Sequence, residues 1–293
     1  MNVLHLNFVD INSTFITPNF MSTLEINSTI PMLSQEVSHL ISKIAEKEMD
    51  FFADDGIEVL HDFRVNIRKL RTWLQIFEMA GYPVKKLQKH SLHCHLIGNE
   101  LRNFDILLHW MKKNLSLVSK KCLNTVNLKR KKLKKAFIKE LITENAISKL
   151  RIFGRNFLSH NVLMTKSDFQ PSIEQYIHKK KQKFHQILPH AADDLEQLHE
   201  IRKILKKIRY SLYLMPIIDV DKIETMKELQ DILGYINDRR VWIDILHSKL
   251  KKVEGVSALE TIFREEINGK ISEFRAYITN KNGDWWTLAG SNR

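Results

Sequence analysis

With 293 residues, 43% of them hydrophobic, and a formal charge of +12, the chain can bury a core and is strongly basic. This composition excludes a wholly disordered chain, and two cysteines without a CxxC motif exclude a disulfide framework. No apolar run reaches the roughly 18–20 residues of a membrane span, and the first residues lack the basic start of a signal peptide. We therefore expect a cytoplasmic protein whose partner is nucleic acid, an anionic membrane surface or another polyanion.

The predicted elements are helices throughout. Residues 1–30 contain no Lys or Arg and are rich in Asn, Ser and Thr, so we interpret them as a polar N-terminal extension. From Pro31 onward apolar residues recur every three or four positions, and Gly and Pro are scarce, which favours long helices over turn-rich β structure. A first helix ends at Asp54-Asp55-Gly56, and further helices are predicted over roughly 57–80, 84–97, 103–114, 117–142, 145–158, 171–189, 193–215, 221–249 and 256–279.

The chain divides into two helical halves. The least helical stretch, residues 159–170, is the predicted connector between a first half, 31–158, and a second half, 171–280. Residues 281–293 have no clear periodicity and are predicted to form a tail.

The two halves repeat one pattern. The first contains HDFRVNIRKLRTWLQIF from His61, and the second contains HEIRKILKKIRYSLYLM from His199, an offset of 138 residues. At this offset four more basic positions match, pairing Arg64, Arg68, Lys69 and Arg71 with Arg202, Lys206, Lys207 and Arg209. Downstream, LIGNELRNFDIL of the first half corresponds to ILGYINDRRVWI of the second half. An internal duplication is the simplest explanation.

Each repeat places its cations in one stripe. At about 100° per residue, His61, Arg64, Arg68 and Arg71 fall within an arc of about 80°, with apolar residues opposite. Like charges one turn apart destabilise a helix, so such a stripe needs either carboxylates from neighbouring helices or an external anion. Two matching stripes in a chain with a charge of +12 favour the external anion.

At these residues the sequence resembles a CHAD domain, the conserved-histidine α-helical domain. The resemblance covers roughly residues 31–279 and rests on H-x-x-R-V-x-x-R-K-x-R, beginning at His61, and on LHEIRKILKKIRY, beginning at Leu198. LQDILG and Asp238 continue the second motif. Arg102-Asn103 departs from the usual Arg-Asp of the family, which puts an orienting role of Asn103 in doubt, and residues 1–30 have no family counterpart.

The resemblance implies two antiparallel helical bundles related by pseudo-twofold symmetry, with basic helices lining a central cavity or groove. It also implies binding of inorganic polyphosphate by a stand-alone module without a known reaction, and association with polyphosphate granules. Arg forks and Lys charges on successive helical turns suit this linear anion. We expect no catalytic residues, cofactor or metal. The predicted polyphosphate-binding residues are His61, Arg64, Arg68, Lys69, Arg71, Arg102, His199, Arg202, Lys206, Lys207, Arg209 and Tyr210.

Two lysine-rich stretches are weaker candidates for the same surface. KRKKLKK begins at Lys129 and HKKKQKFH begins at His178, and either could equally be an ordinary solvated helix face. The residues singled out in them are Lys131, Lys134, Lys135, Lys179 and Lys183.

Other functions remain as alternatives. Non-specific nucleic-acid binding is the first, because phosphate contacts alone give affinity, although Tyr210 is the only aromatic residue placed like a stacking platform. A histidine phosphotransfer protein is a minor alternative that rests on the four-residue HDFR match at His61. A metal site at His90, His93 and Cys94 lacks HExxH or CxxC spacing and is not expected.

Overall fold

The computed structural model describes residues 33–53, 57–159, 165–215 and 220–280. The regular elements of these residues are helices, which confirms the predicted all-α class. All described residues belong to one compact unit. The α-helices are α1 (Leu33–Ala53), α2 (Ile57–Met79), α3 (Lys85–Leu96), α4 (Asn99–Lys113), α5 (Lys120–Glu144), α6 (Ala146–Ser159), α7 (Lys166–Ile187), α8 (Leu195–Leu212), α9 (Val220–Leu250) and α10 (Val256–Asn280), joined in places by the short 3-10 helices η1 (Leu115–Leu117) and η2 (Leu188–Asp193).

Two helix starts differ from the prediction. Helix α4 begins at Asn99 rather than near residue 103, because Gly98 takes a φ of 75° and allows the chain to turn directly into the next helix. Helix α7 begins at Lys166, inside the predicted connector, because Thr165 and Asp168 form a capping box. Pro171 therefore lies within α7 instead of opening it. The predicted extension, 1–30, and tail, 281–293, lie outside the described residues.

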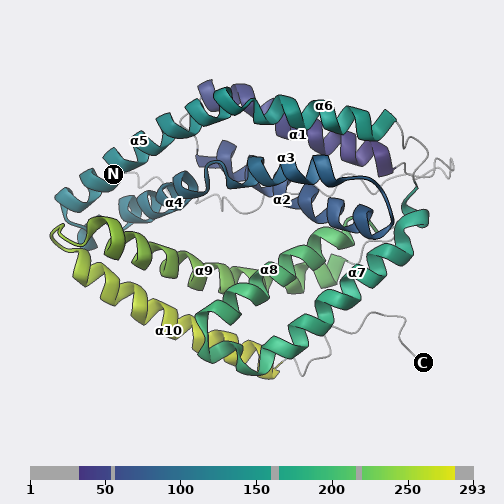
Figure 1. Ribbon diagram of the computed structural model, residues 1–293. Coiled ribbons are helices and arrows are strands. Elements are labelled where there is room, and N and C mark those ends of the chain that lie inside the picture. The colour runs from purple at the N-terminus through teal and green to yellow at the C-terminus, as the bar shows by residue number, and fades with distance from the viewer. Residues whose placement is uncertain (1–32, 54–56, 160–164, 216–219, 281–293) are drawn as a thin grey trace, which may run out of the picture. The chain divides into compact units, whose positions relative to one another are not determined.

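The first six helices pack around an aromatic core. Helix α1 contacts α2 and α6, α3 contacts α2 and α6, and α4 contacts α5 (Figure 1). The ring of Phe51 meets the rings of Phe63 and Phe137 edge to face, with centroids 5.3 and 5.0 Å away. The apolar side of α2 is thus fixed in this core, and its basic side is left facing the last four helices.

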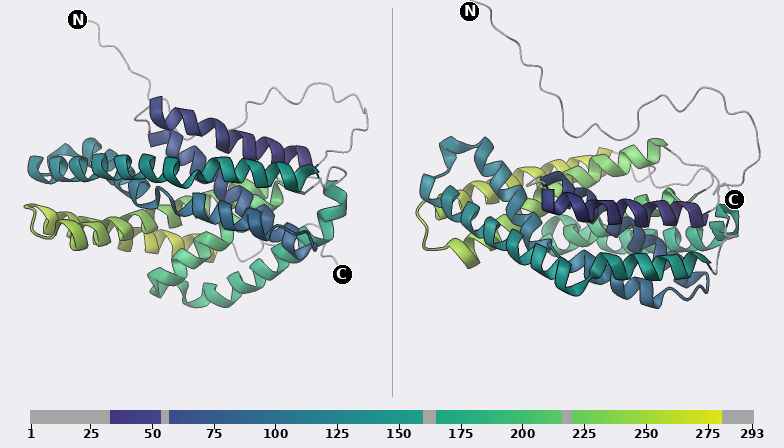
Figure 2. Two further views of the ribbon diagram at one scale, coloured as in Figure 1. Left: turned by 45° about the horizontal axis from the view of Figure 1, so that its top comes forward. Right: turned by 90° about the horizontal axis from the view of Figure 1, so that it is seen from above.

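The last four helices form a second group and meet α2 and α4. Helix α8 contacts α7 and α9, and α9 contacts α10 along its length (Figure 2). Contacts of α2 with α7 and α8, and of α4 with α9, join the two groups. The indole Nε1 of Trp73 donates to the backbone carbonyl of Tyr210 at 2.9 Å, and the hydroxyl of Tyr176 donates to Gln75 Oε1 at 2.6 Å. These two bonds, the first buried and the second partly buried, fix the register of the α2 face against α7 and α8.

Membrane insertion finds no support in the described helices. None of them combines the length and the apolar character that crossing a bilayer requires.

Candidate functional site

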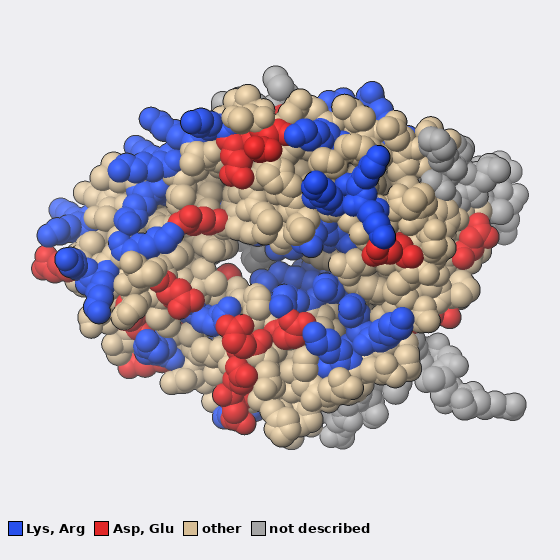
Figure 3. All heavy atoms as spheres, viewed as in Figure 1, with Lys and Arg blue, Asp and Glu red and all other residues tan. Residues whose placement is uncertain are grey.

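The basic faces of α2 and α8 are brought together. Positive charge on Arg68 of α2 acts on Arg202 and Lys206 of α8, and also on Arg64 and Arg102. Figure 3 shows Lys and Arg side chains gathered at the central hollow, between the helices drawn in its upper and lower parts. We name the central basic cluster by its seven members: Arg64, Arg68 and Arg71 of α2, Arg102 of α4, and Arg202, Lys206 and Arg209 of α8.

Carboxylates in the described part of the chain do not neutralise this cluster. None of its seven members forms an ion pair or a hydrogen bond with a described Asp or Glu side chain. Asp238 of α9 is close enough to act on Arg102, Arg202 and Lys206, but only at longer range. The Nε atoms of Arg68, Arg202 and Arg209 are buried without a hydrogen-bond partner among the described residues. Buried donors without a partner destabilise a fold, so these atoms favour the binding of a ligand that offers hydrogen-bond acceptors.

Burial and neighbouring cations lower the pKa values of two members of the cluster, Arg64 and Lys206. Burial, reinforced by the charges of Arg68 and Arg102, lowers the pKa of Arg64 to about 9. Burial, reinforced by Arg68 and Arg202, holds the pKa of Lys206 well below its ordinary value. An anion placed among these groups would offset the repulsion between them and favour their charged forms.

Two histidines face the cluster from different helices. Arg102 Nη2 lies 2.9 Å from His61 Nδ1, and Arg102 Nη1 donates to the carbonyl of Ile57 at 3.2 Å. Burial and the charge of Arg102 lower the pKa of His61 to about 4. Burial and the charge of Arg71 lower the pKa of His95, at the end of α3, to about 3. Both side chains are therefore neutral at neutral pH.

His95 is a site residue that the sequence motifs did not indicate. Its carbonyl accepts a hydrogen bond from Arg64 Nη1 at 3.3 Å, and its Nδ1 is buried without a described partner. Its position depends on the end of α3 just before Gly98. The sequence of α3 does not indicate this role by itself. Two other histidines of the same helix lie elsewhere, His93 near Glu144 and His90 stacked on Phe153.

His199 occupies a different environment in α8. Its Nδ1 lies 2.5 Å from Asn237 Oδ1 of α9. Burial lowers its pKa, the hydrogen bond to Asn237 raises it, and the charges of Arg240, Lys203 and Arg202 lower it further. Asn237 is thus the residue that orients His199, whereas Arg102 orients His61.

Gly234 of α9 leaves space for the side chain of Arg202. A Cβ built on Gly234 would lie 3.4 Å from Arg202 Nη2 and 3.5 Å from its Nε, so the guanidinium lies against this bare position of α9. The glycine in the second motif therefore has a packing role at the cluster.

Three predicted residues lie beside the cluster rather than in it. The ammonium of Lys69 lies over the rings of Trp73 and Tyr213, at 4.6 and 4.9 Å from their centroids, and the charges that act on it are Glu36, Lys43 and Lys166. Lys207 is surrounded instead by Lys180, Glu200, Lys203 and Lys183. The side chain of Tyr210 is buried, at 4% exposed, next to Arg209.

The weaker candidates lie on two outer surfaces. Lys131 and Lys135 are exposed on α5, where the neighbouring Arg130 pairs with buried Asp105 at 2.8 Å, and Lys134 also acts on Asp105. Lys179 and Lys183 are exposed on α7, and Lys183 donates to Glu200 at 2.7 Å. Neither surface belongs to the central basic cluster.

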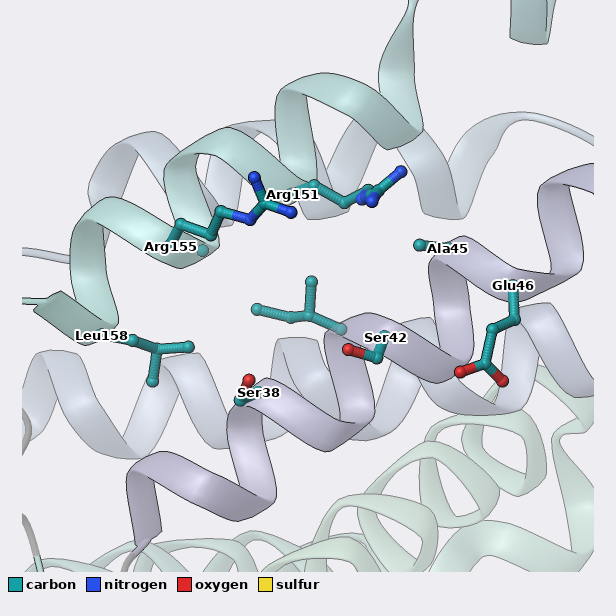
Figure 4. A pocket seen from close by; sticks show the side chains of 9 residues that line it. Ser38, Ser42, Ala45, Glu46, Arg151, Arg155 and Leu158 are labelled. Carbon is teal, nitrogen blue, oxygen red and sulfur yellow. The ribbon is translucent and has the colours of Figure 1, made fainter.

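A separate hollow of about 310 Å³ lies between α1 and α6. Arg151 and Arg155 extend over it from α6, and Ser38 and Ser42 come from α1 (Figure 4). Glu46 also lines it, and none of the predicted binding residues does. Within the described residues, no three His, Cys, Asp or Glu side chains are grouped so that they could hold a metal ion.

In its described residues the chain is a helical protein with internal cations that form no ion pair with a described carboxylate. The chain matches the model of the CHAD domain over residues 35–247, and it therefore belongs to the CHAD domain family. A solved structure, the CHAD domain from the plant Ricinus communis, is similar to it with a TM-score of 0.68 at 20% identity, covering 85% of this chain and 92% of that chain. At this identity the likeness shows the fold. No curated protein matches the chain.

Proposed function

We propose that the chain binds inorganic polyphosphate in the central basic cluster, in the cytoplasm and without catalysing a reaction. The observation that carries this proposal is the convergence of seven cations from α2, α4 and α8 without an ion pair to a described carboxylate. We also propose that the two halves derive from a duplication and that the cluster lines one basic cavity shared by both.

The chemistry of the cluster suits a chain of phosphates. Six of its seven members are arginines, whose guanidinium forks can grip two oxygens of one phosphate group or of neighbouring groups. A bound polyanion would relieve the mutual repulsion that Arg68 exerts on Arg202 and Lys206. Because Arg68 acts on cations of both halves, one polymer held there would contact both stripes at once.

Aromatic side chains near the cluster support polyphosphate over single-stranded nucleic acid. Trp73 is 1% exposed and Tyr210 is 4% exposed, so neither ring offers a face to a base. The ring of Tyr213 is covered by Lys69. Stacking platforms are the usual means of holding unpaired bases, and the aromatic residues described here do not provide one.

A pair of double variants tests the proposal. Arg68→Glu with Arg209→Glu reverses two cluster charges, and Lys69→Glu with Lys207→Glu reverses two neighbouring charges outside the cluster. Both change the net charge equally and take one residue from α2 and one from α8. Titration with labelled long-chain polyphosphate should show a loss of about 100-fold or more for the first variant and less than about fivefold for the second. Circular dichroism should show unchanged helical content in both.

Equal losses in the two variants would contradict the proposal. That result would mean that polyphosphate responds to net charge alone and that the cluster is not a specific site.

A further inference from the structure

The two motif histidines, His61 and His199, have opposite hydrogen-bonding partners. A guanidinium group has only donors, so His61 Nδ1, at 2.9 Å from Arg102 Nη2, must accept with its lone pair. The neutral ring of His61 then carries its proton on Nε2. Asn237 Oδ1 has only lone pairs, so His199 Nδ1, at 2.5 Å from it, must donate. The neutral ring of His199 therefore carries its proton on Nδ1 and has a bare lone pair on Nε2.

We propose that Arg102 and Asn237 act as positioning residues that fix opposite tautomers, so that neutral His61 donates to a phosphate oxygen while His199 donates only after it takes up a proton. The inference rests on the proposed polyphosphate function and gives the two histidines of that site different roles. Neutral His61 already presents an N–H at Nε2. The lone pair of neutral His199 would repel a phosphate oxygen, whereas protonation turns the same atom into a charge-assisted donor.

The surroundings of each ring agree with this division. The charges that act most strongly on His61 are cations: Arg102 of α4, Arg68 and Arg64 of α2, and Lys206 of α8. Protonation of His61 would also destroy the bond from Arg102, because both atoms would then be donors.

Different charges act on His199. Arg240 of α9 and Lys203 and Arg202 of α8 act on it, while the bond to Asn237 stabilises its protonated form. Two of these cations already pair with carboxylates of α8, Arg240 with Glu196 and Lys203 with Glu200. A phosphate bound beside His199 would add further negative charge next to the ring and favour uptake of a proton.

The first test reads the tautomers in the free protein, independently of any ligand. Long-range proton–nitrogen NMR of histidine-labelled protein at about pH 7.5 should show His61 protonated on Nε2 and His199 on Nδ1, with His61→Gln and His199→Gln used to assign the signals. His199 protonated on Nε2 would mean that the Asn237 amide is turned round and would overturn the inference.

The second test measures protons taken up on binding. Calorimetric titration of the full chain with long-chain polyphosphate, in buffers of different ionisation enthalpy at about pH 7, gives the number of protons bound with the ligand. Lys206 can also take up a proton, because burial holds its pKa low, so the comparison between variants is decisive. His199→Gln should lower the uptake by about half a proton or more, and His61→Gln should leave it unchanged.

The experiments distinguish failure of the proposed polyphosphate binding from failure of the proposed histidine roles. Binding with equal proton uptake in both variants would overturn the division of roles while leaving polyphosphate binding intact. Absence of polyphosphate binding by the unaltered chain would overturn the proposed function, and the NMR tautomers would still stand on their own.

Discussion

The helices that follow α2 and α8 differ in one respect that changes the site. After α2 the chain enters α3 and α4, which are separated at Gly98, whereas after α8 it enters α9, a single helix of 31 residues. The break ends α3 at a point where the carbonyl of His95 accepts from Arg64, and it brings Arg102 to His61. The unbroken helix brings Asn237 to His199. Two similar sequence motifs therefore end in chemically different histidine sites.

The two regions also differ in how their helix pairs are clamped. Between α4 and α5 the earlier helix supplies the carboxylate, and Asp105 accepts from Arg130 of α5 at 2.8 Å. Between α9 and α10 the earlier helix supplies the guanidinium, and Arg239 donates to Glu266 of α10 at 2.7 Å. The order of acid and base along the chain is reversed, but each pair joins two neighbouring helices. Each pair of helices thus contains a matched acid and base, and which helix carries the acid differs between the two regions.

The largest effect should come from breaking the more buried clamp. Asp105→Asn should lower the free energy of unfolding by about 3 kcal/mol, because it removes the buried carboxylate charge that pairs with Arg130 at 2.8 Å. Glu266→Gln should cost about 1 kcal/mol, since Glu266 is partly exposed and Arg239 remains stacked over Tyr235 at 3.4 Å. Urea unfolding measures both, and an equal cost would show that the two clamps are equivalent.

The break at Gly98 offers the next comparison. Gly98→Ala should lower the free energy of unfolding by about 2–3 kcal/mol, because alanine disfavours a φ of 75° and its Cβ would lie 3.0 Å from the ring of Phe137. Gly234→Ala should stay within about 1 kcal/mol of the unaltered chain, because it lies within a helix and meets Arg202 at an ordinary contact distance. Tolerance of both alanines in urea unfolding would show that the break is unimportant.

The smallest effect concerns acid stability and separates His61 from His199. The pKa of His61 is lowered to about 4 in the folded chain, so between its ordinary value and 4 the unfolded chain binds a proton that the folded chain does not. Stability is therefore full above the unfolded pKa and falls as the pH falls. His61→Gln should lose about 1 kcal/mol less than the unaltered chain between about pH 7.5 and pH 5.5.

The matched variant for that experiment is His199→Gln. The hydrogen bond to Asn237 partly offsets the effects of burial and neighbouring cations on His199, so its removal should change the acid limb less. Unfolding by urea at a series of pH values gives both curves. A larger change for His199→Gln would contradict the assignment of the two environments.

Helices and basic stripes could be predicted because they depend on local periodicity. Helical spacing places Arg64 with Arg68, and Arg202 with Lys206, on one face of each helix, whereas the meeting of the two faces depends on tertiary packing. The predicted start of α7 is too late because Pro171 is a common helix-start residue, whereas the helix begins at the capping pair Thr165 and Asp168.

Other site features depend on contacts between distant segments. Lys69 lies at the edge of its stripe, and the rings of Trp73 and Tyr213 hold it outside the cluster. The place of His95 follows from the turn at Gly98 and from packing of α3, and the bond between Asp105 and Arg130 joins residues of different helices. None of these contacts has a local sequence signature, because each requires the tertiary arrangement.

The most direct test of the central claim is a competition titration at physiological salt. Labelled long-chain polyphosphate bound to the full chain is challenged with duplex DNA, single-stranded RNA or free phosphate. A dedicated site built from the central basic cluster predicts that polyphosphate stays bound in an excess of each nucleic acid. Equal competition by DNA or RNA, with a steep loss of affinity as salt rises, would contradict it and identify a general basic surface that binds nucleic acid.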